Sequence, residues 1–506
     1  EEAAFLAAIP SAPSIYINSL NSSKLLTKRN SILYQMYELG YITKAQLKSA
    51  LSAPILIKSR KNKISSPYFS DEIFRIISKK VSQEEFFSKG FYIKTTMNKK
   101  IQEALTEAFE GELINFTKTQ HWKGVIRNIK NDSRDYKEIL KKINKDLPAT
   151  INKITSCVVI DVQKNYIICN TLEQKIEIKL NEKNYKNVKI NIGDVILCRF
   201  LKNSNEYEIY QTPEITGGAI LMDTSNGDIL GMVGGYSFDI SPFNCITQAK
   251  RQPGSTIKPF VYAAALEQGM NEFDTIEDKP VVITLSKGEK YSPHNYNGKS
   301  YGKTPLRDGL IHSRNLSTVN LALSIGIAPI SKLLKEAQLT QDKVPISSVL
   351  GSIEVLPINL LSAFSAFVNE GEMVFPRFIQ NISQPNLLDE HRHALDNLCA
   401  IKKKKILSKE TANSIKNMLS DTCKFGTASR LAGVEEEYGI QIGGKTGTTN
   451  NFKDAWFIGY FTFKGKTYLF CTFIGYKFPK SLGDHCSGAR VALPVFISFL
   501  KKFIKS

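Results

Sequence analysis

The chain has 506 residues, of which 42% are hydrophobic and 23% charged, and its formal net charge is +19. At roughly 150 residues per domain the length predicts three to four domains, and the apolar content suffices for buried cores, which excludes a disordered protein. The 67 Lys and Arg residues are scattered rather than gathered on one stripe. We therefore expect a solvated basic surface and no nucleic-acid partner, with attraction to an anionic surface as the alternative.

Neither a metal nor a membrane span is expected from the sequence. The eight cysteines form no Cys-x-x-Cys pair and no His spacing that suits zinc. No run approaches the roughly 18 apolar residues that a spanning helix needs. The chain begins Glu1-Glu2 without an initiator Met or the zones of a signal peptide, so we expect it to be cut from a longer protein.

The first 150 residues predict helices followed by a linker. Residues 1–58 read as three helices, the last opened by a capping box of Thr43 and Gln46. Residues 59–150 are rich in Lys, Ser and Asn, and predict a linker or pedestal with a strand at 91–95 and a helix with Leu105 on its apolar face.

Residues 151–212 alternate with a period of two. Five or six short runs, such as Tyr166-Ile-Ile-Cys169, are separated by Asn, Lys, Glu and Gly. This spacing predicts a small β-barrel of the OB type. Because its basic residues are not interleaved with aromatic ones, we expect a structural or protein-docking insert rather than a binder of single strands.

Residues 213–506 predict an α+β sandwich, with an antiparallel sheet packed between helices. Thr224-Ser-Asn-Gly227 reads as the turn of a hairpin between two buried strands. Long apolar helices follow, then strands at 455–463 and 467–474 and a last helix from about Val495. Strands, inserted helices, strands and a helix in this order are typical of that class.

The first candidate motif is Ser255-Thr-Ile-Lys258. Pro253-Gly254 breaks the chain before an apolar run, so Ser255 is predicted to open a helix. Positions three apart share a helix face, which puts the Lys258 ammonium within reach of the Ser255 hydroxyl. Taken alone this pattern is weak, because Ser and Lys three apart are common on solvated faces.

Two further motifs follow. Ser313-Arg-Asn315 precedes an apolar helix and by itself reads best as a helix cap. Lys445-Thr446-Gly447-Thr448 opens a strand after Gly443-Gly444. A strand glycine often marks the close approach of another backbone, so an extended peptide could add there as a strand, with its carboxylate facing Lys445, Thr446 and Thr448.

Ser-x-x-Lys, Ser-x-Asn and Lys-Thr-Gly in this order match the set found in penicillin-binding proteins and β-lactamases. The flanks resemble class A (bifunctional) penicillin-binding proteins of type 1A over nearly the whole chain. They are Arg251–Phe260, Pro293–Tyr296, Gly351–Val355, Gly443–Thr449 and Phe452–Phe457, with Glu2–Pro13 resembling the end of a glycosyltransferase domain. Departures are Tyr291-Ser292, where the family often has Trp, and Ser487-Gly488, where a Gly pair is common.

The resemblance implies a serine acyl transfer on the D-Ala-D-Ala end of peptidoglycan stem peptides, with no cofactor and no metal. Ser255 would be the nucleophile and Lys258 the base, its pKa lowered by burial and by Lys445 in the same cleft. Ser313 would relay a proton, Asn315 would hold the substrate amide, and Lys445, Thr446, Gly447 and Thr448 would bind the substrate. The backbone N–H groups of Ser255 and Thr448 would form the oxyanion hole.

Partners and location also follow from the resemblance. We expect stem peptides and β-lactam antibiotics in the site, cell-wall synthesis proteins at the barrel, and the periplasmic face of the bacterial inner membrane, reached through an upstream segment. In the family that the chain resembles, the acidic glycosyltransferase motifs lie upstream of the segment that matches Glu1 to Pro13, so we expect no glycan polymerisation by this chain alone.

Two rival functions remain open. A carboxypeptidase or β-lactam hydrolase would use the same acylation but deliver water, and Glu354 is its candidate deacylating carboxylate. A docking or β-lactam-sensing protein would keep the fold without turnover. A Ser-His-Asp arrangement is weaker, because the nearest histidine, His312, falls outside the matched pattern.

Overall fold

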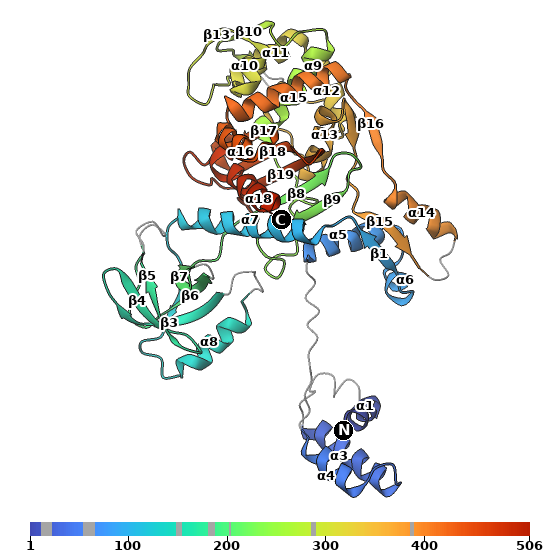
Figure 1. Cartoon of the computed structure of the whole chain (residues 1–506). Coiled ribbons are helices and arrows are strands. Elements are labelled where there is room, and N and C mark those ends of the chain that lie inside the picture. Colours follow the sequence, from blue (N-terminus) through green and yellow to red (C-terminus); the bar gives the residue numbers. More distant parts are fainter. Residues whose placement is uncertain are drawn as a thin grey trace. The chain divides into compact units, whose positions relative to one another are not determined.

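The computed structural model describes residues 1–11, 23–53, 66–147, 154–180, 188–201, 204–284, 290–384 and 389–505. Two compact units can be distinguished, Glu1–Ser65 and Ser66–Ser506, and each is described by itself (Figure 1). The predicted boundaries at 58/59 and 150/151 lie outside the described residues.

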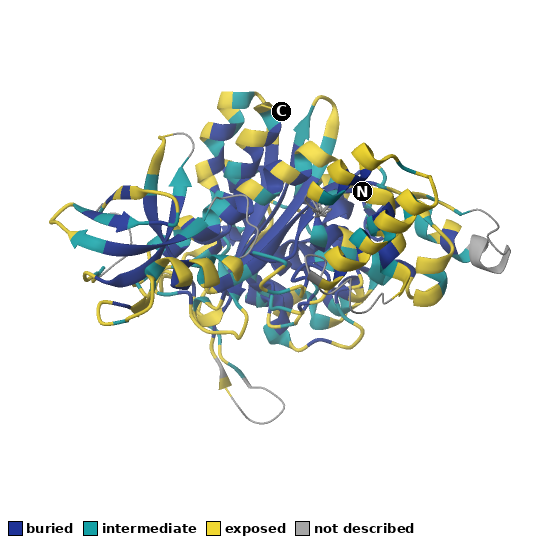
Figure 2. Cartoon of the chain, turned by 90° about the horizontal axis from the view of Figure 1, so that it is seen from below, coloured by how far each residue is buried: buried dark blue, intermediate teal, exposed yellow. Residues whose placement is uncertain are grey.

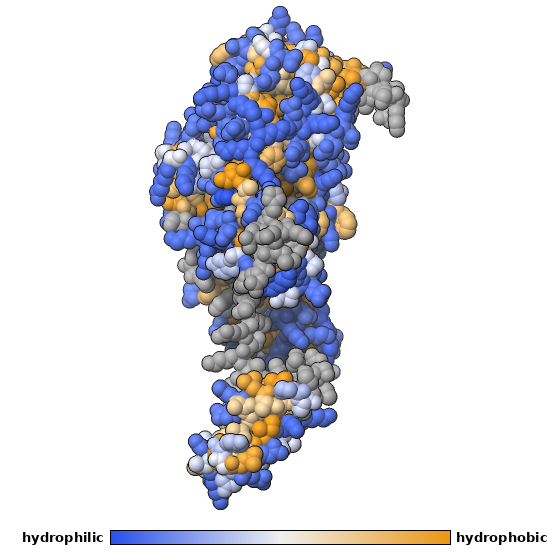
Figure 3. Space-filling view, turned by 90° about the vertical axis from the view of Figure 1, so that its right-hand side faces the viewer, coloured by the Kyte–Doolittle hydropathy of each residue, from blue (hydrophilic) through white to orange (hydrophobic). Residues whose placement is uncertain are grey.

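The first unit is helical, as the sequence predicts. Its elements are α1 (Glu2–Ala8), the 3₁₀ turn η1 (Ile9–Ser11), α3 (Ser23–Glu38) and α4 (Lys44–Ser52). The capping box is confirmed, because the Gln46 N–H donates to Thr43 Oγ1 (3.3 Å) and the Thr43 N–H donates to Gln46 Oε1 (2.8 Å). The buried cluster is small, and Figure 3 shows apolar side chains on the visible face of this unit, in line with exposures of 64% for Leu6 and 71% for Leu39.

A five-stranded antiparallel sheet forms the centre of the second unit. Its strands, in spatial order, are β17 (Gln441–Thr448), β18 (Asp454–Phe463), β19 (Lys466–Tyr476), β8 (Ile215–Asp223) and β9 (Ile229–Val233). Side chains alternate between the faces, so that Trp456 and Ile458 enter one core and Phe457 and Phe461 the other. Figure 2 shows these strands in the colour of buried residues.

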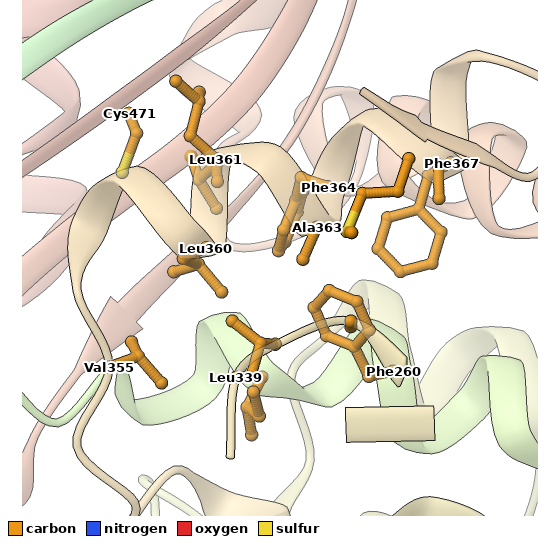
Figure 4. Packing of buried hydrophobic residues seen from close by; sticks show 14 of the residues in the cluster. Phe260, Leu339, Val355, Leu360, Leu361, Ala363, Phe364, Phe367 and Cys471 are labelled. Carbon is orange, nitrogen blue, oxygen red and sulfur yellow. The ribbon is translucent and has the colours of Figure 1, made fainter. Parts of the chain in front are cut away.

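Helices rich in apolar residues lie on the first side of the sheet. Helix α13 (Pro357–Val368) packs on β19 and α15 (Lys409–Lys424) on β17. Helices α9 (Lys258–Glu267) and α10 (Leu306–Ile311) pack on α15, and α11 (Asn315–Ile325) and α12 (Ile327–Glu336) pack on α9. Phe260 of α9 meets Phe364 and Phe367 of α13, with ring centroids 5.5 and 4.9 Å apart (Figure 4). This contact fixes the helix that follows Ser255 to the layer above the sheet.

The opposite face is covered by α7 (Lys99–Lys118) and α18 (Leu493–Lys505). Phe499 of α18 stacks on Phe470 of β19 at 5.5 Å, and Leu105 of α7 lies in the same buried cluster. The α+β sandwich is therefore as predicted. The segment predicted as a linker contributes α7 directly to the sheet's core.

A closed barrel of five strands stands between α7 and the central sheet in the sequence. The strands are β3 (Ile154–Val162), β4 (Tyr166–Asn170), β5 (Lys175–Lys179), β6 (Asp194–Leu201) and β7 (Glu206–Tyr210). They pair in the order β3-β4-β5-β7-β6 and close through β6 on β3, with only β5 and β7 parallel. This is the OB arrangement that the sequence predicts. Strand β2 (Val125–Asn128) extends β6, and α8 (Tyr136–Lys145) packs on the barrel.

The remaining elements connect these layers. The helical ones are α5 (Pro67–Ile77), α6 (Gln83–Ser88), α14 (Asp389–Cys399), α16 (Ala432–Tyr438), α17 (Gly488–Val491), η2 (Gly254–Ile257), η3 (Ile346–Leu350), η4 (Ser429–Leu431) and η5 (Asn450–Phe452). The strands form two-stranded antiparallel pairs: β1 (Tyr92–Thr95) with β15 (Ile379–Ser383), β10 (Thr275–Asp278) with β13 (Gly302–Pro305), β11 (Ile283–Thr284) with β12 (Lys290–Tyr291), and β14 (Glu372–Val374) with β16 (Lys403–Lys405).

In the described part of the chain no single helix is long and apolar enough to cross a membrane. Helices α11 and α12 meet that test only as a pair, and they are bent by 100° at the break between them.

Candidate active site

Ser255 lies in a tight turn just before α9. The sequence predicts that Ser255 opens an α-helix, but the structure places it in the 3₁₀ turn η2, and the α-helix begins at Lys258. Between Pro253 and Phe260 every residue is buried except Ser255, which is partly exposed. The turn therefore presents the Ser255 side chain at the surface of an otherwise buried segment.

Two glycines hold this turn in place by close backbone contacts. Gly254 has φ +54°, and a Cβ on it would lie 2.6 Å from the Thr448 carbonyl oxygen. Gly351 has φ +87°, and a Cβ on it would lie 2.2 Å from the Gly254 carbonyl oxygen. Only glycine fits both the positive φ and the contact. The turn with Ser255 is thus clamped between the end of β17 and the end of η3.

Ser313 occupies the short connection between α10 and α11. Its φ is +56°, a left-handed conformation that costs about 1–2 kcal/mol in a non-glycine residue. This conformation turns the Ser313 carbonyl toward Lys258, whose Nζ donates to Ser313 O at 2.6 Å and to Asn315 Oδ1 at 2.7 Å. The Ser313 hydroxyl lies 3.4 Å from the same nitrogen.

Lys445 reaches the same hydroxyl from the sheet. It lies on β17, the edge strand, and its Nζ donates to Ser313 Oγ at 2.7 Å and to Thr446 O at 3.3 Å. Both lysines have an exposed fraction of 0%. The Ser313 hydroxyl therefore lies between two buried amino groups that come from different elements.

Burial controls the charge of both lysines. It lowers the pKa of Lys258 well below the usual value, the nearby Lys445 lowers this pKa further, and the Asp278 carboxylate opposes both. Burial also lowers the pKa of Lys445, to about 7. Near neutral pH Lys258 can therefore exist as a neutral amine, which an exposed lysine cannot do.

The Thr446-Gly447-Thr448 segment continues β17 past Lys445. Thr446 Oγ1 lies 2.7 Å from Thr427 Oγ1, and Thr448 Oγ1 accepts from the Gly488 N–H at 3.0 Å. A Cβ on Gly447 would lie 2.5 Å from the Pro253 carbonyl oxygen. The strand thus packs its backbone directly against the turn that carries Ser255.

The structure brings Lys258, Ser313, Asn315 and Lys445 into direct contact, and places Ser255 and Thr448 on the turn and strand beside them. Among the residues that the structure describes, no hydrogen bond joins Ser255 to Lys258. The sequence-based role of Asn315 concerned the substrate amide, whereas its Oδ1 here accepts from Lys258 and its Nδ2 donates to His294 O at 2.7 Å.

Sequence reasoning missed two residues beneath this cluster. Asn295 Oδ1 accepts from the N–H groups of Asn315 (2.7 Å) and Leu316 (3.1 Å), and so caps α11 from a distant loop. Asp278, at the end of β10, holds Asn295 in turn. Asn295 lies in the Pro293–Tyr296 segment that carries the family resemblance, whereas no motif or residue spacing in the sequence indicates a role for Asp278.

No metal centre is found in the described ranges, where no group of three His, Cys, Asp or Glu side chains is arranged to hold an ion. The site consists of hydroxyls, amines, amides and backbone groups. These are the groups that nucleophilic acyl transfer needs.

A 3₁₀ turn with a serine, a buried lysine three residues on and a Lys-Thr-Gly edge strand define a class of acyl-transfer domain. The profile of the penicillin binding protein transpeptidase domain family matches residues 217–477, and the chain belongs to this family. Penicillin-binding protein 1A of Rickettsia felis is 32% identical over 535 residues, which include 100% of this chain and 66% of that protein. The chain thus spans just under two thirds of that relative's length.

Two solved structures resemble the fold. Penicillin-binding protein 1A from Haemophilus influenzae has a TM-score of 0.85 at 24% identity, covering 99% of this chain and 80% of that one. The PonA1 protein of Mycobacterium tuberculosis in complex with penicillin V has a TM-score of 0.57 at 16% identity, covering 87% of this chain and 93% of that one. At these identities the likeness concerns the fold.

Proposed function

We propose that this chain is a peptidoglycan DD-transpeptidase that works through an acyl-enzyme on Ser255. The observation that carries the proposal is the pair of buried lysines that share the Ser313 hydroxyl beside the Ser255 turn. The Ser255 hydroxyl attacks the carbonyl between two terminal D-alanines. The C–N bond then breaks, D-alanine leaves, and an amine of a neighbouring stem peptide displaces Ser255 to form the cross-link.

Lys258 acts as the base in this proposal. A neutral amine has two N–H donors and one lone pair, and Lys258 Nζ has two close acceptors, Ser313 O and Asn315 Oδ1. These two acceptors use both donors, and the lone pair is left to take the proton of Ser255. Burial supplies the lowered pKa that the neutral amine requires.

Ser313 and Lys445 serve the leaving group and the substrate. The Ser313 hydroxyl, held by Lys445 Nζ at 2.7 Å, can pass a proton to the departing amine. Because β17 is the edge strand of the sheet, a stem peptide can pair along Thr446-Gly447-Thr448 with its carboxylate toward Lys445. The N–H groups of Ser255 and Thr448 lie on segments in close contact and would bind the oxyanion.

The hydrolase alternative lacks a buried carboxylate at the proposed position. Glu354 is exposed, and it lies next to Val355, whose backbone pairs with Arg251. We therefore favour transfer to an amine, with water as the competing acceptor.

We further propose that the chain works at the periplasmic face of the inner membrane and that the barrel contacts other cell-wall synthesis proteins. The barrel interior is filled by Cys157, Cys169, Cys198 and aliphatic side chains, so only its outside is open to a partner. Photo-crosslinking in cells from Ile126, which is 46% exposed on β2, tests this. Adducts with cell-wall synthases are expected, and adducts with unrelated proteins alone would contradict it.

Glycan polymerisation is not expected from this chain by itself. Glycosyl transfer needs carboxylates that deprotonate the attacking hydroxyl and stabilise the leaving diphosphate. The acidic residues of the first unit are Glu1, Glu2 and Glu38, which are exposed. Supplying lipid-linked disaccharide-peptide should give no glycan, and a moenomycin-sensitive polymer would show the expectation wrong.

Covalent labelling tests the central proposal. A fluorescent penicillin should label the chain stoichiometrically, with the adduct mapped by mass to Ser255, because its ring carbonyl takes the place of the D-Ala-D-Ala amide. Ser255→Ala should abolish labelling, and full labelling of that variant would contradict the mechanism. Donor peptide with an amine acceptor then separates the three functions by product: a cross-linked dimer, a trimmed monomer or no turnover.

A further inference from the structure

Asp278 is a fully buried carboxylate in the layer beneath the site. It ends β10, and its exposed fraction is 0%. Its oxygens accept from Ser317 Oγ (2.6 Å), Ser317 N (3.2 Å), Asn295 Nδ2 (2.7 Å) and Tyr301 N (3.0 Å). Donors alone surround both oxygens, which is the environment that an ionised carboxylate requires.

A chain of hydrogen bonds leads from this carboxylate to Lys258. Asp278 Oδ1 accepts from Asn295 Nδ2, which orients the amide so that Asn295 Oδ1 caps the first N–H groups of α11. The capped residue Asn315 presents its own Oδ1 to Lys258 Nζ at 2.7 Å. The Asp278 and Asn295 side chains thus hold the backbone of Asn315, and the Asn315 side chain completes a relay that ends on the lysine amine.

Few titratable groups surround Asp278. Those that the elements around it contribute are Lys258 and Tyr262 of α9 and Arg314 before α11, while Lys303 of β13 and Lys299 and His294 of the intervening loop are exposed. Burial and Lys445 lower the pKa of Lys258, and the charge of Asp278 opposes this lowering. Burial raises the pKa of Tyr262, and Asp278 adds to that rise. Arg314 is turned away, donating to Thr304 Oγ1 and lying over the Tyr301 ring.

We propose that Asp278 is a positioning residue for the acyl transfer, which fixes the Lys258 amine through Asn295 and Asn315 and keeps a buried carboxylate in the layer beneath it. The inference rests on the proposed function, since it concerns the same base. The relay connects the start of α11 to β10, which belongs to a strand pair outside the central sheet.

The test measures acylation of the whole chain by a fluorescent penicillin from pH 5 to 9. Non-covalent affinity and the limiting acylation rate are separated by varying the drug concentration. The variants are Asp278→Asn, which removes the charge, Asn295→Ala, which breaks the relay but keeps the charge, and Ser317→Ala as matched control. Ser317→Ala removes a hydrogen bond to Asp278 outside the relay. Thermal unfolding monitors the fold of each.

Asp278→Asn should slow limiting acylation at least tenfold and move its acid limb to lower pH by half a unit or more. Asn295→Ala should slow limiting acylation at least tenfold without shifting the acid limb and with little change in non-covalent affinity. Ser317→Ala should acylate within threefold of the parent rate. A folded Asp278→Asn with the parent's acid limb would overturn the inference. If that variant does not fold, an Asn295→Ala that acylates at the parent rate would overturn it. A parent chain unlabelled at Ser255 would instead refute the proposed function.

Discussion

Lys258 and Lys445 share one hydroxyl partner and the same complete burial, yet the proposed mechanism gives them different chemistry. Lys258 must lose its proton, whereas Lys445 must carry a positive charge when it holds a carboxylate. Arg keeps its charge in proteins and cannot act as a base. The two sites should therefore differ in how they tolerate arginine.

Lys258→Arg is expected to slow penicillin acylation about a thousandfold, the usual size of a general-base contribution. Lys445→Arg should be milder, about tenfold, because the positive charge remains in place. Labelling rates measured beside thermal unfolding separate lost chemistry from lost fold. A Lys258→Arg chain that acylates near the parent rate would show that Lys258 is not the base.

The lowered pKa of Lys445 also predicts a pH dependence of stability. Its pKa is about 7 in the folded chain and roughly 10.4 in the unfolded one. Between these values the unfolded chain binds more protons, so the free energy of unfolding rises with pH, by up to about 1.4 kcal/mol per unit for this group. Below pH 7 the contribution no longer changes.

Urea unfolding midpoints at pH 7, 8 and 9 measure this slope in the parent and in Lys445→Met, a substitution that removes the ionisable group and keeps a side chain of similar size. The variant should show a flatter rise over this range than the parent. An equal or steeper rise in Lys445→Met would contradict the assignment.

The turn η2 depends on elements far apart in sequence. Gly351, at the end of η3, and Gly447, on β17, approach it from two sides. Gly439 gives a matched comparison for Gly351, because it has φ +62° but nothing within 4 Å of an added Cβ. Alanine at either position carries the cost of a positive φ, about 1–2 kcal/mol. Only at Gly351 does the added methyl group displace the Gly254 backbone.

Gly351→Ala should therefore slow acylation on the order of a hundredfold, which is the penalty for misplacing a reacting group by about 1 Å. Gly439→Ala should lose stability but acylate at the parent rate. Stopped-flow labelling of both variants measures the contrast. Equal rates in the two would show that the clamp does not position Ser255.

At the scale of the whole molecule, the second unit contains its own cores and the complete candidate site. The two large buried clusters draw on residues from Phe69 onward, while the first unit has one small cluster around Leu33 and Leu47. The barrel has a separate interior. The unit Ser66–Ser506 is thus large enough to fold by itself.

A chain of residues 66–506 is expected to label with penicillin at the same rate as the whole chain. Its main unfolding transition should lie within a few degrees of the parent's, because no member of its large cores is removed. Calorimetry and labelling on both chains measure this. A loss of labelling in the shorter chain would mean that the first unit supports the site.

Much of this arrangement could be predicted from the sequence because it is local. The hairpin at Thr224–Gly227, the capping box at Thr43, the alternation of the barrel strands and the motif at Lys445 are patterns of neighbouring residues. Their periods of two and 3.6 and their turn residues follow from backbone geometry alone. The order of the three motifs also pointed to the family that the profile match confirms.

Only the tertiary structure decided how the site is assembled. The 3₁₀ turn at Ser255, the left-handed Ser313 and the relay from Asp278 through Asn295 join segments that no local period connects. The physical reason is that buried polar groups must find hydrogen-bond partners, and in this site those partners come from segments that are distant in the chain. The sequence by itself determined which chemical groups the site contains and which local elements carry them. The fold determined that Lys258 is buried beside Lys445, and therefore the protonation state in which it can act.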